Sequence, residues 1–364
     1  MLSKRALNRA LLERQMLLRR SSMSALDAIE RLVAVQGQEP NWPYVGLWNR
    51  LEDFRRDDLT SLLRNRRVVR GPLIRSTQHL AGAEDFLWLR PLVQPALDRT
   101  LRSAYFARET AGLDLAELAD AGRELLADRT LTRPQLGRLL TERFPGRDGR
   151  VLAAAMQLRV PMVHPPPSGT WGGWGNRGAV PLALAEAWIG RPMTASPRIE
   201  TMIGRYLTAF GPAGVMDIQT WSGLTRLRGV VDGMRPRLRV FRDERGQELF
   251  DLPDAPLADP DLPVPVRFQP AFDNLLLGHA ERSRVIGDED RKRVMPGGAI
   301  VRPTFLVDGF VRGTWSLEGT TLLVSPFRQL SEEDAAAVLE EAERLLDFAA
   351  PDAETSEVRF VGGC

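Results

Sequence analysis

One order of predicted elements, helices followed by a hairpin, occurs three times in this chain and constrains its fold more than any other feature. Apolar residues at helical spacing predict the helices, and short apolar or alternating stretches around a turn predict the hairpins. In the first copy, we expect helices at about 1–20, from 24 to about 36–38, and 57–65, then strands at 67–70 and 73–80 around a turn at 71–72. Helices over about 84–109 follow. Three helices and then a hairpin is the order of a winged helix, with the hairpin as its wing.

The second and third copies follow the same order with looser spacing. The second has expected helices at 115–126, from about 131 with Pro134 near the start, and 150–159, then strands at 160–164 and 170–175. The third has expected helices at 199–209, 215–221 and 224–233, then strands at 237–242 and 248–252 with Gly246 in the turn. The modules are therefore similar in their order of elements and are not sequence repeats.

The pattern changes after residue 250. Proline and aspartate are frequent in 251–265, which is typical of a linker. Beyond it, we expect strands at 266–268, 300–307, 311–317 and 321–324, turns at 308–309 and 318–319, and a closing helix at 331–348 capped by Ser331. The C-terminal part is thus mostly β with a terminal helix.

The length of the chain also indicates several modules, because 364 residues exceed the roughly 250–300 at which single cores stop growing. The sequence predicts an α+β fold of tandem winged-helix modules. Their expected bounds are 1–110, 111–195 and 196–250, followed by the C-terminal β domain at 251–364.

Several classes of protein are excluded by what the sequence lacks. The one cysteine, Cys364, rules out a disulfide framework and a cysteine-based metal site, and the three histidines have no metal-ligand spacing. There is no Walker A sequence and no strand-borne GxGxxG, so we expect no nucleotide cofactor and no metal. No apolar run is long enough to span a membrane, and no signal peptide is recognisable. We therefore expect a cytoplasmic protein without a membrane partner.

Basic residues are unevenly distributed, although the formal net charge is only +2. They gather at 4–20, 64–75, 226–239 and 291–293, while acidic residues gather elsewhere. Lys4 and Lys292 are the only lysines among 49 basic residues; the others are arginines. Arginine suits phosphate and base-edge contacts, but a coding bias explains its frequency equally well. The segregated charge favours a basic groove for a polyanion such as DNA.

The stretch Gln36-Gly37-Gln38-Glu39-Pro40 is the strongest candidate for chemistry. Two uncharged amides are a poor choice for acid–base catalysis, but each offers a donor and an acceptor and can hold a water molecule. Side chains two residues apart share a face only when the backbone is extended or sharply turned. The preceding helix must therefore end by Gln36 if both amides are to face one water. Glu39 is an alternative as a base, or a surface residue.

Several motifs together, in this order along nearly the whole chain, resemble one family. They are Val35–Pro40 with the aromatic run through Trp48, Arg75–His79, Trp221–Leu224, Phe272–Arg282, Gly297–Thr304, Val307–Gly309 and Gly313–Trp315. The family is the bacterial winged-helix DNA glycosylases, the AlkZ/YcaQ-like group.

The resemblance implies winged-helix modules stacked around a concave DNA-binding channel, with a C-terminal β domain. It implies excision of N-alkylated purines from double-stranded DNA, and some members unhook interstrand crosslinks or confer self-resistance to alkylating natural products. It places the catalytic pair on Gln36 and Gln38, the two-glutamine form that is similar to the azinomycin-resistance branch. Gly37 departs from the bulkier apolar residue common at the middle position and predicts a looser loop.

Other residues are candidates for contacting DNA or supporting the site, each with a structural alternative. The DNA-binding candidates are Arg75, Thr77 and His79 at the end of the first wing, Trp171, Trp174 and Arg177 in the second, and Arg302 and Arg312 on the C-terminal hairpin. Asp273 and Asn274 are supporting candidates. The alternatives are a solvated strand edge, core tryptophans, surface arginines and a helix cap.

Three functions compete on the sequence alone. The first is a monofunctional alkylpurine DNA glycosylase that acts as a monomer, without a cofactor, near the nucleoid. The second is a winged-helix transcription regulator or architectural DNA-binding protein without catalysis, although no obvious dimerisation helix is present. The third, a nucleotide-binding enzyme, lacks a phosphate loop. Release of a free base separates the first from the others.

Overall fold

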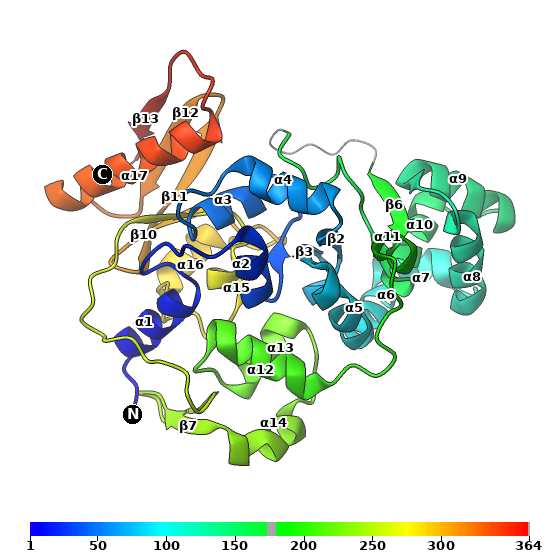
Figure 1. Ribbon diagram of the computed structural model, residues 1–364, viewed down its shortest axis with the longest axis horizontal. Helices are drawn as coiled ribbons and strands as arrows, with labels where there is room; N and C mark the ends of the chain where they lie inside the picture. Colours follow the sequence, from blue (N-terminus) through cyan, green and yellow to red (C-terminus); the bar gives the residue numbers. More distant parts are fainter. Residues whose placement is uncertain (173–179, 363–364) are drawn as a thin grey trace.

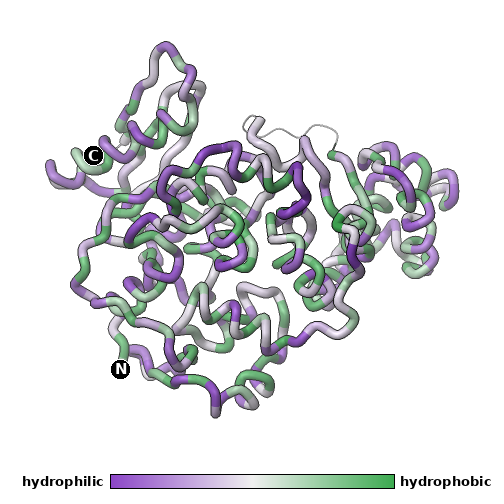
Figure 2. Tube along the Cα trace, viewed as in Figure 1, coloured by the Kyte–Doolittle hydropathy of each residue, from purple (hydrophilic) through white to green (hydrophobic). Residues whose placement is uncertain are grey.

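The structure is a computed structural model that describes residues 1–172 and 180–362. Helices α8–α10 lie at one end of the molecule and the C-terminal helix α17 with strands β11–β13 at the other, with β2 and β3 between them (Figure 1). Apolar segments concentrate in the interior of the trace, and hydrophilic ones at its periphery (Figure 2). The protein therefore has a mixed fold of helices and small, mainly antiparallel sheets.

The first 110 residues form a three-stranded sheet of order β1-β3-β2 surrounded by helices. The elements are α1 Lys4–Arg14, α2 Ala25–Arg31, β1 Val35–Gln36, α3 Trp42–Trp48, α4 Arg56–Arg64, β2 Val68–Pro72, a 3-10 turn Ile74–Ser76, β3 Gln78–Gly82, α5 Ala83–Leu92, α6 Gln94–Leu101 and α7 Ala104–Thr110. Helix α1 is shorter than expected, and the expected end of the second helix at about 36–38 is wrong, because α2 ends at Arg31. Helix α3 and strand β1 were not expected. The hairpin is confirmed, but its turn lies at 73–77 and not at 71–72. Pro72 continues β2 because this strand is at the sheet edge, where a missing N–H costs little.

The next section contains α8 Leu115–Leu126, β4 Leu131–Thr132, α9 Arg133–Arg143, α10 Gly149–Arg159, β5 Met162–Val163, β6 Pro181–Leu184 and α11 Ala185–Ile189. The three expected helices are confirmed. The expected second strand of the hairpin is wrong: β5 pairs with β6, residues 170–172 form no strand, and 173–175 lie outside the described residues. Strand β6 also pairs with β4 and is therefore the central strand of this sheet, and its Leu182 and Ala183 are buried.

The third section agrees closely with its sequence pattern. It contains α12 Ile199–Phe210, α13 Val215–Ser222, α14 Arg228–Met234, a 3-10 turn Arg235–Arg237, and the hairpin β7 Arg239–Arg242 and β8 Glu248–Asp251. Gly246 takes a positive φ in the hairpin turn, as expected.

The C-terminal section follows an irregular stretch and forms a five-stranded sheet of order β13-β12-β11-β10-β9. Its elements are β9 Arg267–Gln269, α15 Asn274–Leu277, α16 Asp288–Val294, β10 Thr304–Val307, β11 Phe310–Glu318, β12 Thr321–Pro326, α17 Glu332–Ala349 and β13 Glu357–Phe360. The four expected strands and the capped closing helix are confirmed. Strand β13 was not expected, and it pairs in parallel with β12.

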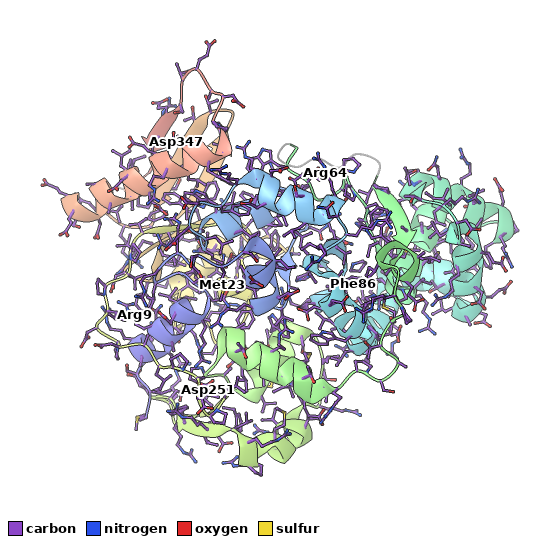
Figure 3. The ribbon with its side chains drawn as sticks, viewed as in Figure 1. Arg9, Met23, Arg64, Phe86, Asp251 and Asp347 are labelled. Carbon is purple, nitrogen blue, oxygen red and sulfur yellow. The ribbon has the colours of Figure 1, made fainter. Side chains whose placement is uncertain are left out.

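Buried ion pairs join distant parts of the chain. Arg14 of α1 makes two charge-assisted hydrogen bonds of 2.7 Å to Asp251, which is labelled in Figure 3. Arg50 binds Asp273 in the same bidentate way. The main hydrophobic cluster contains residues from each of the four expected units, from Leu11 to Val311. The bounds of the four units remain predictions.

In the described part of the chain, no helix combines the length and apolar character that crossing a lipid bilayer requires.

Candidate functional site

Gln36 and Gln38 lie where the chain leaves helix α2 and enters the first sheet. Helix α2 ends at Arg31, and Val33 turns the chain with a φ of 68°. The next residues are extended, and Gln36 pairs with His79 of β3. The helix therefore ends before Gln36, which meets the backbone condition for two amides facing one water. Gln36 is 6% exposed, whereas Gln38 is exposed at a bend.

Hydrogen bonds fix the backbone of this segment on both sides. The Gly37 N–H donates to Gln78 O at 2.8 Å. On the other side, Arg70 donates from Nε to Gly37 O at 2.8 Å and from Nη2 to Gln38 O at 3.1 Å. The Gln78 N–H also donates to Gln38 Oε1 at 3.4 Å. These tertiary hydrogen bonds restrain the backbone where no side chain does, and a looser loop at Gly37 stays a prediction.

Gly37→Ala is expected to keep or raise stability by about 0.4–1 kcal/mol, because alanine restricts the unfolded chain. Gly37 has no positive φ, and an added Cβ would meet Leu80 Cγ at 3.4 Å and Pro43 Cγ at 3.5 Å, which are ordinary contacts. Denaturant unfolding measures the change. Gly71→Ala is the matched control and should be clearly destabilised, since its Cβ would lie 2.6 Å from Met162 O. A comparable loss in both variants would contradict the prediction.

Arg70 connects the glutamine segment to the second section through a buried polar network. Its Nη1 donates to His164 Nδ1 at 2.8 Å and to Ser168 Oγ at 2.9 Å. Burial and the nearby guanidinium groups hold the pKa of His164 well below its ordinary value, so the ring is neutral. Its Nε2 then donates to Gln157 Oε1 at 3.0 Å, which also accepts from Arg133 Nη2 at 3.2 Å. Burial lowers the pKa of Arg70 to about 10, and the group stays a cation at neutral pH.

A cleft of about 630 Å³ opens beside this segment. Three kinds of side chain line it: the polar Gln38, Glu39 and Gln78, the basic Arg70 and Arg133, and the apolar Phe272, Ile300 and Val301. Ile300 is about half exposed and follows a turn in which Gly297, Gly298 and Ala299 all have positive φ. The cleft is thus bounded by the first section, the second section and the C-terminal section.

Four buried acceptor atoms of the described residues around the glutamine segment have no hydrogen-bond partner: Gln36 Oε1, Glu39 Oε2, Gln78 Oε1 and His79 Nε2. Two buried donors there also lack a partner in the described part of the chain: Asn41 Nδ2, three residues after Gln38, and Nε of Arg133, which lines the cleft. Burial, reinforced by the charge of Arg75, lowers the pKa of His79 to about 3. The neutral ring donates from Nδ1 to Thr77 O at 3.0 Å, which leaves Nε2 as an acceptor. This arrangement suits a bound group that presents hydrogen-bond donors or positive charge.

Asp273 and Asn274 lie behind the glutamine segment. Asp273 accepts from Arg50 at 2.7 and 2.9 Å and from the Leu275 N–H at 2.8 Å, so it caps α15, which is the structural alternative that the sequence offered. Asn274 Nδ2 donates to Ala34 O at 2.7 Å, two residues before Gln36. Both side chains are buried, and Asn274 holds the backbone from which the glutamines extend.

The three candidates at the end of the first wing point into the fold. Arg75 has a φ of 54° and donates from Nη1 to Trp221 O at 2.9 Å. Thr77 Oγ1 donates to Ile74 O at 3.2 Å, which closes the turn. His79 is 1% exposed. Their contacts here are with the protein's own backbone, and a side chain buried like His79 does not reach a phosphate in this conformation.

The other DNA-binding candidates differ in exposure. Trp171 packs edge-on against Tyr44 and Phe348, and the Arg56 guanidinium lies 4.1 Å from its ring centre. Trp174 and Arg177 lie outside the described residues.

Arg302 and Arg312 are exposed, and neither guanidinium has a hydrogen-bond or ion-pair partner in the described part of the chain. Arg312 lies in β11, and Arg302 lies just before β10. The turn between β10 and β11 packs on α1, where Asp308 pairs with Arg5 and Arg9.

Sequence reasoning missed Arg70 and its network, and it gave Gln78 no role of its own. A signal was available for Arg70: a charged residue directly follows Val68 and Val69 in a strand that is buried throughout. Its partner His164 lies 94 residues away in sequence and in turn binds Gln157, and no local pattern identifies either residue.

Comparison with known proteins identifies the family of this chain. The model of the DNA glycosylase AlkZ-like family matches residues 29–348, which include Gln36, Gln38 and Ile300. The chain is 25% identical over 368 residues to the interstrand DNA cross-link repair glycosylase of Streptomyces sahachiroi, covering 91% of this chain and 92% of that protein. The solved structure of Streptomyces sahachiroi DNA glycosylase AlkZ has the same fold, with a TM-score of 0.80 and 23% identity over 99% of this chain and 100% of that one. The chain therefore belongs to the AlkZ-like DNA glycosylase family.

Proposed function

We propose that this protein hydrolyses the N-glycosidic bond of cationic N-alkylated purines in double-stranded DNA, N7-alkylguanine first among them, with a water held by Gln36 and Gln38. The observation that carries the proposal is the set of buried acceptor atoms around these two residues, none of which has a hydrogen-bond partner in the described part of the chain. Acceptors can orient a water molecule through its hydrogens and favour positive charge on the sugar as it develops.

The chemistry of the substrate explains why neutral amides suffice. A purine alkylated at N7 already carries a positive charge, so its bond to the sugar breaks without a proton from the enzyme. The sugar becomes oxocarbenium-like, and a water held beneath C1′ completes the reaction. An unmodified purine would have to leave as an anion or be protonated first. A site without a general acid therefore selects for cationic lesions.

The cleft suits lesions larger than a methylated base. Its volume of about 630 Å³ and its apolar wall of Phe272, Ile300 and Val301 can receive a bulky alkyl substituent. The Streptomyces sahachiroi relative is named for interstrand cross-link repair. We therefore include natural-product adducts and crosslinks among the proposed substrates. The helix-and-hairpin units of the first 250 residues would serve as winged-helix modules that bind the duplex, with the protein acting as a monomer.

A panel of matched duplexes tests this function. The lesions are 7-methylguanine, a bulky N7 adduct and an N7-linked crosslink, with unmodified guanine and the uncharged O6-methylguanine as controls. Mass spectrometry should detect free base from the cationic lesions alone, in the presence of a metal chelator, and the abasic strand should stay intact until alkali is added. Sequence-selective binding with no base release from any lesion would instead support a transcription regulator.

Arg302→Ala and Arg312→Ala are each expected to weaken binding to all duplexes and to lower the slope of log affinity against log salt by about 1. Both guanidiniums are exposed and have no protein partner among the described residues, so they are available to phosphates. Fluorescence anisotropy over a salt series measures the slope. Arg359→Ala is a control on β13, outside the proposed winged-helix modules, where the residue is paired with Glu357. Unchanged slopes in both hairpin variants would remove these residues from the DNA interface.

A further inference from the structure

We infer that Glu39 is the base of this reaction: its carboxylate takes the proton that the attacking water loses, while Gln36 and Gln38 orient that water. This inference rests on the proposed function and adds a step that the two glutamines cannot perform.

The balance of the reaction requires a proton acceptor. As the bond between C1′ and the purine nitrogen breaks, its electron pair goes to the purine and cancels the positive charge, so a neutral base leaves. The water oxygen forms a new bond to C1′ and becomes positively charged until it releases one proton. A glutamine amide accepts hydrogen bonds but is far too weak a base to take that proton, whereas a carboxylate can.

Glu39 is placed to do so. It follows Gln38 in the bend after β1, and both residues line the cleft together with Gln78. Of the described residues that line this cleft, Glu39 is the only one with a carboxyl group. Its Oε2 is buried and has no hydrogen-bond partner in the described part of the chain.

The neighbouring cations do not neutralise this carboxylate by direct pairing. The negative charge of Glu39 favours the cationic form of Arg70, so the two groups lie close together. Yet the donors of Arg70 are engaged by Gly37 O, Gln38 O and His164. Arg133, the other cation of the cleft, donates to Gln157.

The remaining titratable groups near the glutamine segment are poor bases for this step. His164 uses both ring nitrogens in hydrogen bonds to Arg70 and Gln157. Burial lowers the pKa of His79 to about 3, and its ring lies in the sheet behind the segment. A carboxylate is a weak base too, but it suffices here because a water bound to the sugar carbon is strongly acidic. Its negative charge also favours the cationic sugar.

The test compares Glu39→Gln, which keeps the size of the side chain, with Glu39→Asp, which keeps the carboxylate. Single-turnover release of 7-methylguanine is followed from mildly acidic to mildly alkaline pH, and DNA affinity is measured in parallel. The wild-type rate should fall on the acidic side of this range, because a protonated carboxyl cannot accept a proton. Glu39→Gln should be slower by at least about a hundredfold, should bind DNA normally and should lose this acidic limb. Glu39→Asp should retain the limb and part of the rate.

Other outcomes overturn the inference in distinguishable ways. A Glu39→Gln rate within about twofold of the wild-type rate, with the same fall at acidic pH, would mean that solvent and not Glu39 accepts the proton. A loss confined to DNA affinity would make Glu39 a binding residue. Equal losses in both variants would show that the shape of the side chain matters and not its charge. Absence of base release by the wild-type protein would refute the proposed function itself.

Discussion

Alanine in place of Gln36 or Gln38 is expected to slow single-turnover base release by about two to three orders of magnitude, while DNA affinity stays nearly unchanged. Each amide is proposed to hold the attacking water and to stabilise charge that develops only in the transition state, so its loss should affect the chemical step and not binding. Rapid-quench measurement of 7-methylguanine release at saturating enzyme isolates that step.

The two glutamines should also behave as a unit, since both are proposed to contact one water. The double variant is therefore expected to be little slower than the slower single variant. Gln329→Ala, an exposed glutamine on the C-terminal section, is a matched control and should keep the wild-type rate. Wild-type rates in both single variants would remove the catalytic assignment, whatever the protein's activity on other lesions.

Asp273→Ala is expected to lower the free energy of unfolding by about 3–5 kcal/mol, because it leaves the buried charge of Arg50 without a partner. The two side chains are 1% and 3% exposed and joined by two hydrogen bonds. The variant also loses the cap of α15. Denaturant unfolding at neutral pH, monitored by circular dichroism, measures the loss.

An exposed ion pair supplies the comparison for Asp273. Arg143 and Glu124 are 46% and 65% exposed, so Glu124→Ala should change stability by no more than about 1 kcal/mol. Replacing both Arg50 and Asp273 by apolar residues of similar size should recover part of the loss, since no buried charge remains unpaired. A loss of less than about 1 kcal/mol for Asp273→Ala would mean that water or other groups solvate Arg50.

Parts of the candidate site could be predicted from local sequence. Ser24 begins helix α2 by accepting from the Asp27 N–H, and the chain is extended again well before Pro40. The two glutamines were placed by resemblance to a family, and their catalytic role remains a prediction. The inward orientation of the Arg75, Thr77 and His79 side chains could not be predicted. A short polar segment has the same sequence pattern whether its side chains face solvent or the interior of the protein.

The sequence by itself determined the elements whose causes are local. Helix α8 has the expected bounds 115–126, the third hairpin turns at Gly246, and the C-terminal hairpin turns at 308–309. Helix caps, turn residues and the period of apolar residues act over a few residues, so they can be recognised in the sequence itself.

Only the tertiary structure decided which distant groups meet. It chose β6 and not residues 170–175 as the partner of β5, and it joined Arg50 to Asp273 across 223 positions. It also brought Arg70 to the backbone of the glutamine segment, and His164 and Arg133 to its cleft. The physical reason is that a buried apolar side chain or polar group can be satisfied by any suitable neighbour in space. The distance between two residues in the sequence does not identify that neighbour.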